Sequence, residues 1–324
     1  MKERKYLISN EGKFFKANLH SHTTVSDGAL SPEESKKLYK DAGYSIVAYT
    51  DHRKYVNHIE LNDDNFLAIA GYEIDINESG KNWENTKVYH LNLYDTNPNE
   101  NTEEKQKSYL PPQDYYDIKS INKYLKEMKE LGFIICYNHP FWSLQDYTDI
   151  KDLDSENIWA MEIYNYGCEL DGLYGYNPQT YDEMLRLNKK WFCVATDDNH
   201  NSFPTESSLC DSFGGFTMIK ANELSYSAII DSLINGNFYS SMGPEIKELY
   251  IEENKLHIKT SPVEKIFVIL KGRNCYKKLA NKGETITEAV FELNGKEEYF
   301  RIDIKDEKGL HANSNAYFIK DILK

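Results

Sequence analysis

The chain has 324 residues, of which 40% are hydrophobic and 28% charged, and no apolar run approaches the roughly 18–20 residues that a membrane helix needs. Its formal net charge of −14 argues against binding to duplex nucleic acid, which requires a basic face. A small anionic substrate stays open, because bound divalent ions can reverse the local sign of the potential. Five cysteines without CxxC spacing argue against a disulfide framework and a thiolate zinc site.

Residues 1–13 form a charged N-terminal extension that lacks the apolar stretch of a signal peptide, which makes the cytoplasm the expected location. From residue 14 to residue 244, short apolar runs alternate with segments of helical character. Strands are predicted at 14–19, 45–50, 66–71, 87–94, 133–138, 160–164, 191–196 and 215–219, and helices at 31–42, 118–131, 178–188 and 222–236. The first helix has the clearest start, with Pro32 at its first position and a capping box of Ser31 and Glu34.

The continuous apolar character of these strands predicts parallel neighbours that are buried on both faces. Repeated strand–helix units favour an α/β fold, namely a TIM-type barrel or a distorted relative, in which catalytic residues lie at the carboxyl ends of the strands. Residues 95–117 interrupt the pattern with a long polar stretch. A lid over the catalytic end and a disordered surface insertion are equally good interpretations of it.

Residues 245–324 differ from the preceding part of the chain in their pattern of apolar and turn residues. Short apolar runs are separated by turn residues, and no helical pattern is present. This predicts a small β-sandwich domain. His257 and His311 lie there away from other histidines, and we expect them to be ordinary structural or surface residues.

Six of the nine histidines stand at or just after predicted strands: His20, His22, His52, His90, His139 and His200. Carboxylates accompany them at Asp27, Asp51, Glu73, Asp197 and Asp198. Histidine and carboxylate side chains suit first-row divalent metals. Each motif alone is weak, since an HxH pair is more often structural and His90 lies inside a strand. Their recurrence at successive strand ends predicts one multinuclear metal centre, and hence a metal-dependent hydrolase.

The ordered motif set resembles the PHP family (polymerase and histidinol phosphatase domains) over residues 14–244. The set comprises HxH with SerAspGly (His20, His22, Asp27), ThrAspHis (Asp51, His52), GlyTyrGlu (Glu73), His90, AsnHisPro (His139) and DxH (Asp198, His200). The resemblance implies a distorted (β/α)7 barrel that binds two or three divalent ions, with manganese, iron or zinc as candidates. Residues 236–244 and the β domain after them resemble the CehA/McbA-type branch, with which hydrolysis of bonds other than phosphoesters is associated.

The resemblance also implies a ligand set for each ion. The first ion would be held by His20, His22, Glu73 and Asp198, the second by Glu73, His90 and His139, and the third by Asp27, His52 and His200. Histidinol-phosphatase-like members have a histidine near the position of Asp27. The aspartate would therefore weaken the third site or favour manganese or iron over zinc there. Asp51 would orient a ligand histidine or carry a proton, and the role of Asp197 stays open.

In the expected mechanism, two adjacent cations lower the pKa of a bridging water to give a hydroxide nucleophile and offset the charge of the transition state. Glu73 would bridge the ions. Arg53 would hold phosphate oxygens or be an ordinary surface arginine, and Asp51 would protonate the leaving group. The pocket lining is expected to include residues that follow His139 or end the strand at 160–164: Trp142, Ser143, Tyr164 and Asn165.

These observations leave three candidate functions. The first is a metal-dependent phosphoesterase that hydrolyses a small phosphate ester or nucleotide, which the family resemblance favours. The second is a metallohydrolase of the same fold that cleaves a carbamate, ester or amide, which the scarcity of fixed basic residues near the expected mouth favours. The third is a noncatalytic metal-binding or interaction module, against which the complete ligand set argues.

Overall fold

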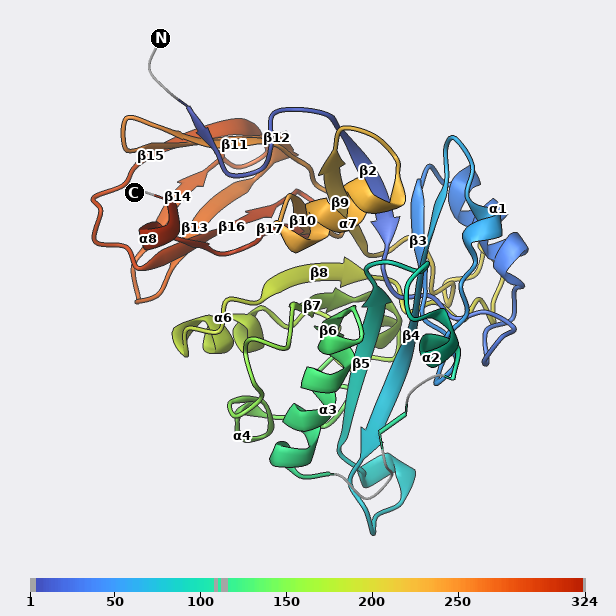
Figure 1. Ribbon diagram of the computed structural model, residues 1–324. Coiled ribbons are helices and arrows are strands. Elements are labelled where there is room, and N and C mark those ends of the chain that lie inside the picture. Colours follow the sequence, from blue (N-terminus) through green and yellow to red (C-terminus); the bar gives the residue numbers. More distant parts are fainter. Residues whose placement is uncertain (1–3, 108–109, 112–115, 323–324) are drawn as a thin grey trace.

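A computed structural model describes residues 4–107, 110–111 and 116–322 (Figure 1). Its strands are β1 (Lys5–Tyr6), β2 (Lys13–Asn18), β3 (Ile46–Tyr49), β4 (Leu67–Asn77), β5 (Val88–Asp95), β6 (Phe133–Tyr137), β7 (Ala160–Asn165), β8 (Phe192–Thr196), β9 (Phe216–Ala221), β10 (Phe238–Ser241), β11 (Ile246–Glu252), β12 (Lys255–Val263), β13 (Lys265–Leu270), β14 (Cys275–Leu279), β15 (Ile286–Glu292), β16 (Tyr299–Lys305), β17 (His311–Ser314) and β18 (Tyr317–Phe318). Its helices are α1 (Pro32–Asp41), α2 (Thr102–Gln106), α3 (Ile118–Glu130), α4 (Tyr147–Ile150), α5 (Tyr166–Leu170), α6 (Pro178–Arg186), α7 (Tyr226–Ile234) and α8 (Ile319–Ile322), with 3₁₀ turns η1 (Ile59–Leu61) and η2 (Trp83–Asn85).

The helices match the sequence pattern closely. The four predicted helices correspond to α1, α3, α6 and α7. The capping box of α1 is confirmed, because Ser31 accepts a hydrogen bond from the backbone N–H of Glu34 and Glu34 accepts one in return. Helix α3 buries one face against the sheet through Ile121, Leu125 and Met128, so local helix signals and packing agree.

The strands form two sheets. The larger sheet runs in the order β14-β13-β16-β17-β10-β9-β2-β3-β4-β5-β6-β7-β8, with β18 beside β16. The smaller sheet runs in the order β1-β11-β12-β15. Strands β2 to β4 are parallel to one another, and so are β6 to β8. The architecture is therefore mixed α/β with one large sheet.

The expectation of parallel neighbours fails at β5, which pairs antiparallel with both β4 and β6. A parallel connection needs a crossover of about a dozen residues or more, usually with a helix. Residues 78–87 link β4 to β5 through the single short turn η2, so the chain forms a long hairpin there. The lower part of Figure 1 shows this hairpin projecting from the sheet.

The large sheet is not closed by a ladder of strands in the described part of the chain. Strand β2 pairs with β3 along one edge and antiparallel with β9 along the other, which leaves no edge for β8. The two ends of the β2–β8 arc meet beyond the strand ladders, where Ser21 and Asn199 form an isolated parallel bridge. The N–H of His22 donates to the carbonyl oxygen of Asn199 at 3.0 Å. In return, the N–H of Asp198 donates to the carbonyl oxygen of His20 at 3.0 Å.

The C-terminal strands form a two-layered β unit that shares the large sheet. Side chains from β11 and β12 in one sheet and from β13 and β16 in the other meet in one buried cluster, which includes Leu249, Ile258, Val268 and Ile302. The sheets do not stop at the predicted boundaries, 13/14 and 244/245. Strand β1 of the N-terminal extension pairs with β11, and β10 pairs with β17.

The described part of the polar segment 95–117 begins at the edge of the sheet opposite to the histidines. Because β5 runs antiparallel, its last residue, Asp95, lies at that far edge. Lys105 of α2 is buried against it, with Nζ 2.6 Å from Asp95 Oδ1. Residues 108–109 and 112–115 lie outside the described residues. The anchored portion of the segment therefore lies away from the end of the sheet that carries the histidines, which a lid would cover.

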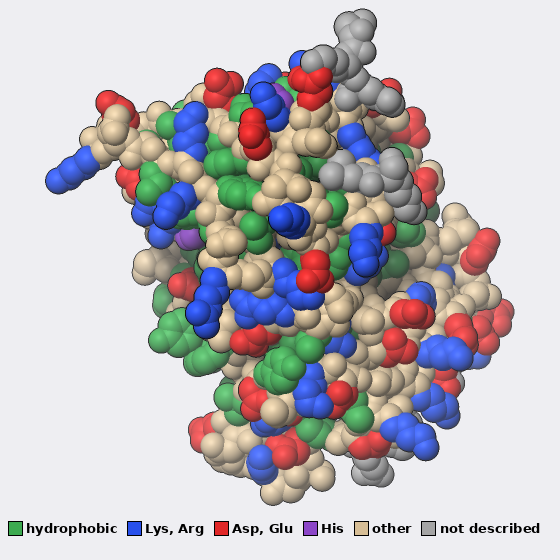
Figure 2. Space-filling model, turned by 90° about the vertical axis from the view of Figure 1, so that its left-hand side faces the viewer, with side chains coloured by type: hydrophobic (Ala, Val, Ile, Leu, Met, Phe, Trp, Pro, Cys, Tyr) green, Lys and Arg blue, Asp and Glu red, His purple; other side chains and the backbone are tan. Residues whose placement is uncertain are grey.

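Surface charges of both signs are mixed on the face that Figure 2 shows, where lysine and arginine side chains alternate with aspartate and glutamate. Exposed ion pairs in the structure include Lys190 with Asp321 and Lys271 with Glu298, both at 2.6 Å. Such exposed pairs contribute little to stability individually. Among the described helices, none has both the length and the apolar character that crossing a membrane requires.

Candidate metal centre

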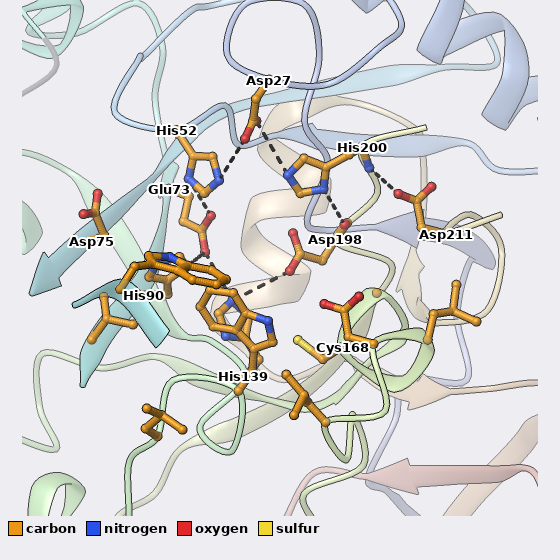
Figure 3. A pocket seen from close by; sticks show the side chains of 18 of the residues that line it. Asp27, His52, Glu73, Asp75, His90, His139, Cys168, Asp198, His200 and Asp211 are labelled. Atoms are coloured by element: carbon orange, nitrogen blue, oxygen red, sulfur yellow. Dashed lines mark hydrogen bonds and ion pairs between the residues drawn. The ribbon is translucent and has the colours of Figure 1, made fainter. Parts of the chain in front are cut away.

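The structure brings all nine predicted metal ligands together at one end of the large sheet, and Figure 3 shows those that line the cavity. Most follow the carboxyl ends of parallel strands: His20 and His22 after β2, His52 after β3, His139 after β6, and Asp198 and His200 after β8. Glu73 lies within β4, level with them. His90 lies near the amino end of β5, and it reaches the same place because β5 runs antiparallel.

Four of these side chains form what we call the buried group: His20, His22, Glu73 and Asp198. His20 Nε2 lies 3.1 Å from His22 Nε2, 3.4 Å from Glu73 Oε2 and 3.0 Å from Asp198 Oδ1. His22 Nε2 lies 3.5 Å from Glu73 Oε2 and 3.1 Å from Asp198 Oδ1. Donors about 2.0–2.1 Å from a tetrahedral ion are separated by roughly 3.3–3.4 Å. The spacing and chemistry of the buried group therefore fit a divalent ion.

A second set, the lateral group, consists of Glu73, His90 and His139. Glu73 Oε1 lies 2.9 Å from His90 Nδ1 and 3.5 Å from His139 Nε2. The other oxygen of Glu73 faces the buried group, so this carboxylate serves both groups through its two oxygens. Asp198 also faces both, since its Oδ2 lies 3.7 Å from His139 Nε2. Two neighbouring ions could thus share these carboxylates.

The outer group consists of Asp27, His52 and His200, with His22 below it. Asp27 Oδ2 lies 3.8 Å from His52 Nε2, and Asp27 Oδ1 lies 3.6 Å from His200 Nε2. The Asp27 side chain is 56% exposed and the two imidazoles are about a third exposed. His22 Nδ1 is buried without a hydrogen-bond partner among the described residues and lies 3.8 Å from Asp27 Oδ1. This donor set also suits an ion, but its donors are farther apart and more exposed to solvent than those of the buried group.

Opposite charges in the centre shift proton affinities strongly. Burial disfavours the charged form of His20, yet the carboxylates of Asp198 and Glu73 outweigh burial and raise its pKa well above the usual value. Burial also disfavours ionised Glu73, but the imidazoles of His90 and His20 hold its pKa well below the usual value. Partial burial likewise disfavours the charged form of His52, but Glu73 outweighs it and raises the pKa of His52 to about 9. The raised pKa values favour the protonated forms of His20 and His52, and metal binding would displace those protons.

Glu162 of β7 is the main site residue that sequence reasoning missed. Its buried carboxylate lies 2.7 Å from His20 Nδ1 and accepts hydrogen bonds from the backbone N–H of His139 (3.0 Å) and from the hydroxyl of Thr196 (2.7 Å). A carboxylate that accepts from Nδ1 fixes the histidine tautomer and directs Nε2 toward an ion. The signal was present, because Glu162 is the one charged residue in the apolar run at 160–164.

Further polar side chains hold the ligands in place. Asn138 donates to Glu73 Oε1 at 2.8 Å, and Asn165 donates to Asp198 Oδ2 at 3.1 Å. Ser143 Oγ lies 3.2 Å from His139 Nδ1. Ser143 and Asn165, which we expected to line the pocket, thus support ligands from behind.

The predicted roles of Asp51, Arg53 and Asp197 can be compared with their positions. Asp51 is buried and accepts hydrogen bonds from the backbone N–H groups of Thr23 (2.8 Å) and Ser26 (3.1 Å), so it shapes the loop between His22 and Asp27. Asp197 points away from the centre and accepts from backbone N–H groups at 213 and 215 and from a tyrosine hydroxyl.

Arg53 adopts a positive φ of 56°. Its guanidinium forms a two-point ion pair with Asp75, in which Nη2 lies 2.7 Å from Oδ2. Together with Asp51 and Asp197, it is absent from the side chains that line the central cavity in the described part of the chain. The geometry therefore does not place a fixed guanidinium over the metal centre.

A cavity of about 820 Å³ opens over the three groups. Its floor includes Glu73, His90, His139 and Asp198, and Figure 3 shows these side chains converging with His52 and His200. Within the described residues, neither lysine nor arginine lines it, whereas apolar and acidic side chains do. The described part of the 95–117 segment contributes nothing to the lining. The volume lies within the usual range for small-molecule sites.

No family model matches the sequence, and no curated protein matches it. A two-domain protein of Bacteroides vulgatus, which contains a predicted PHP-like metal-dependent phosphoesterase, is 16% identical with a TM-score of 0.46, over 98% of this chain and 99% of that chain. A candidate metal-dependent phosphoesterase of Bifidobacterium adolescentis is 11% identical with a TM-score of 0.41, over 62% of this chain and 91% of that one. An amidohydrolase of Chromobacterium violaceum, with bound sulfate and no metal, is 13% identical with a TM-score of 0.37, over 57% and 87%. Similarity at this level assigns neither a family nor an activity to this chain.

Proposed function

We propose that the protein is a metal-dependent hydrolase of the PHP type that cleaves a small phosphate ester. The observation that carries this proposal is the division of Glu73 between two donor groups, with one oxygen 3.4 Å from His20 and the other 2.9 Å from His90. A carboxylate shared in this way is suited to hold two ions close together at the floor of a cavity. We further infer that β2 to β8 correspond to a distorted seven-stranded barrel, opened where β2 pairs with β9.

The residues that would hold the ions are the buried, lateral and outer groups, and manganese, iron and zinc all suit their donors. The chemistry that divalent ions supply at such a centre is activation of water near neutral pH and compensation of negative charge in the transition state. The protein contributes orientation: Glu162 sets the tautomer of His20, and Ser143 and Asn138 fix His139 and Glu73. The cavity above them admits a small substrate.

A second candidate reaction is hydrolysis of a carboxylic ester, amide or carbamate, as in the CehA/McbA-type branch. The observation that favours it is the cavity lining, which in the described residues contains neither lysine nor arginine. Phosphate recognition often recruits such side chains, whereas a neutral carbonyl substrate does not need them. A noncatalytic role fits less well, because an open cavity above nine gathered donors would then have no purpose.

The test compares substrates that share one leaving group. Manganese-loaded protein is assayed with p-nitrophenyl phosphate, bis(p-nitrophenyl) phosphate, p-nitrophenyl acetate and a p-nitrophenyl carbamate, beside the Glu73→Ala variant. We expect turnover of a phosphate substrate that is lost in the variant. Turnover of the acetate or carbamate alone would select the second candidate, and turnover that persists in Glu73→Ala would overturn the assignment of the centre.

A further inference from the structure

The cavity has a floor of candidate metal ligands and an apolar mouth. Five large apolar side chains on its lining are more than a third exposed: Trp83, Leu144, Leu173, Phe203 and Leu209. They come from four separate segments of the chain. A single exposed apolar residue is ordinary, but a contiguous apolar surface at one opening usually marks a binding site. Ligand binding would explain why these side chains converge there.

Trp142 connects this mouth to the metal-binding floor. Its ring lies 5.3 Å from the ring of His90 and 5.1 Å from that of His139, measured between centroids. On its other side it meets Trp83 edge to face at 6.2 Å. Trp83 is 77% exposed, so much of its ring is free to contact a ligand. A group attached to the scissile bond above the lateral group would therefore extend along Trp142 toward Trp83.

The charges around the cavity disfavour a second anionic group on the substrate. Asp75 of the cavity lining is bound to Arg53. Glu84 and Asp171 are exposed residues of the cavity lining, and no lysine or arginine compensates them there among the described residues. Ions on the floor would compensate an anion held there. A further phosphate or carboxylate near the mouth would meet carboxylates, whereas a neutral ring would meet tryptophan and leucine.

We propose that the apolar mouth, with Trp142 and Trp83 as its platform, binds a neutral planar group next to the scissile bond. Preferred substrates are then aryl esters, not nucleotides or sugar phosphates that carry further charge. This inference rests on the proposed function, since it names the substrate class of that site. Aromatic ligand rings gain both apolar burial and edge-to-face contacts on such a platform.

The experiment measures binding and does not require turnover. Full-length protein loaded with Mn²⁺ is titrated with 1-naphthylphosphonate and with methylphosphonate by calorimetry, because the two share a headgroup and differ only in the ring. Burial of the ring should make the naphthyl compound bind about tenfold more tightly or better. Trp83→Ala should remove most of that preference, and Trp83→Phe should restore part of it. Tyr147→Ala is the matched control, because Tyr147 is an exposed aromatic residue outside the cavity lining.

Equal or undetectable binding of the two phosphonates would overturn the proposal, and so would a preference that Trp83→Ala and Trp142→Phe both leave unchanged. Hydrolysis of 1-naphthyl phosphate is measured in parallel. A naphthyl preference without hydrolysis would support the aryl site and reject the phosphoesterase function. Hydrolysis without a naphthyl preference would support the phosphoesterase function and reject the aryl site.

Discussion

The buried group and the outer group use the same donor types and lie side by side, yet they differ in packing. Donor distances within the buried group are 3.0–3.5 Å, and its histidines and Glu73 are inaccessible to solvent. The outer group is spaced at 3.6–3.8 Å, and Asp27 is more exposed than any other donor in the centre. The difference shows that donor type alone does not set affinity, which depends also on how firmly the donors are held.

The cause of the difference lies in the elements behind each group. The buried group is supported by side chains on strands, chiefly Glu162 of β7, which is itself hydrogen-bonded on both carboxylate oxygens. Asp27 and His200 stand on loops, where Asp211 accepts from the backbone N–H of His200 at 2.7 Å and His200 Nδ1 lies 3.1 Å from the carbonyl oxygen of Asp198. Rigid donors lose less freedom when they bind an ion. We therefore expect tight binding in the buried group and exchangeable binding in the outer group.

The largest effect should separate two matched variants, Asp198→Asn and Asp27→Asn. Both remove one carboxylate, and asparagine tolerates the positive φ of 54° at residue 198. Asp198→Asn should lose bound metal from the buried and lateral groups and reduce turnover roughly a hundredfold or more. Asp27→Asn should lose no more than one ion per chain. Elemental analysis after gel filtration measures the metal content, and equal losses in both variants would contradict the comparison.

Glu162→Gln tests whether the contact between the Glu162 carboxylate and His20 Nδ1 produces the tight metal binding expected in the buried group. The amide cannot hold His20 Nδ1 as a carboxylate does, so metal affinity should fall about 10- to 100-fold. Titration against a chelating indicator measures that affinity. Glu127→Gln, at an exposed position of α3, is the control and should bind metal like the unmodified protein. An unchanged affinity in Glu162→Gln would mean that the group is held by other contacts.

Removal of metal by a chelator should occur in two phases. The outer group should release its ion first, because its donors are exposed and widely spaced, and the buried group should release its ion more slowly. Samples taken during incubation with EDTA give the metal content over time. Asp27→Asn should lack the fast phase and keep the slow one. A single phase shared by all ions would show that the groups exchange metal together.

The smallest change expected is a shift of metal preference in Asp27→His. Imidazole is a better ligand for zinc than for manganese, so the variant should retain zinc several times longer than the unmodified protein, with the buried group unaffected. Competition between equal concentrations of zinc and manganese, followed by elemental analysis, measures this. A preference that does not move would indicate that residue 27 is not a ligand.

Most donors of the centre could be predicted as a set because they recur at the ends of apolar runs, although each motif alone is weak. An apolar run followed by a histidine or a carboxylate marks a strand end, and ends of neighbouring strands meet. The catalytic roles predicted for Asp51 and Arg53 rest on their adjacency to His52. In the structure Asp51 binds the loop at 23–26, and Arg53, which has a positive φ, pairs with Asp75. Glu162 was overlooked because its signal is a single charged residue inside an apolar run and belongs to no recognisable motif.

By itself the sequence determined the kinds of donor, their order along the chain, the start of α1 and the change to β structure after residue 244. These features follow from side-chain chemistry and periodicity, which act within a few residues. Tertiary structure decided that β5 runs antiparallel, that β2 is occupied by β9 and cannot close a barrel with β8, and that Glu73 stands between two groups. Those outcomes depend on link length and on competition for strand edges between segments far apart in sequence, which no local pattern encodes.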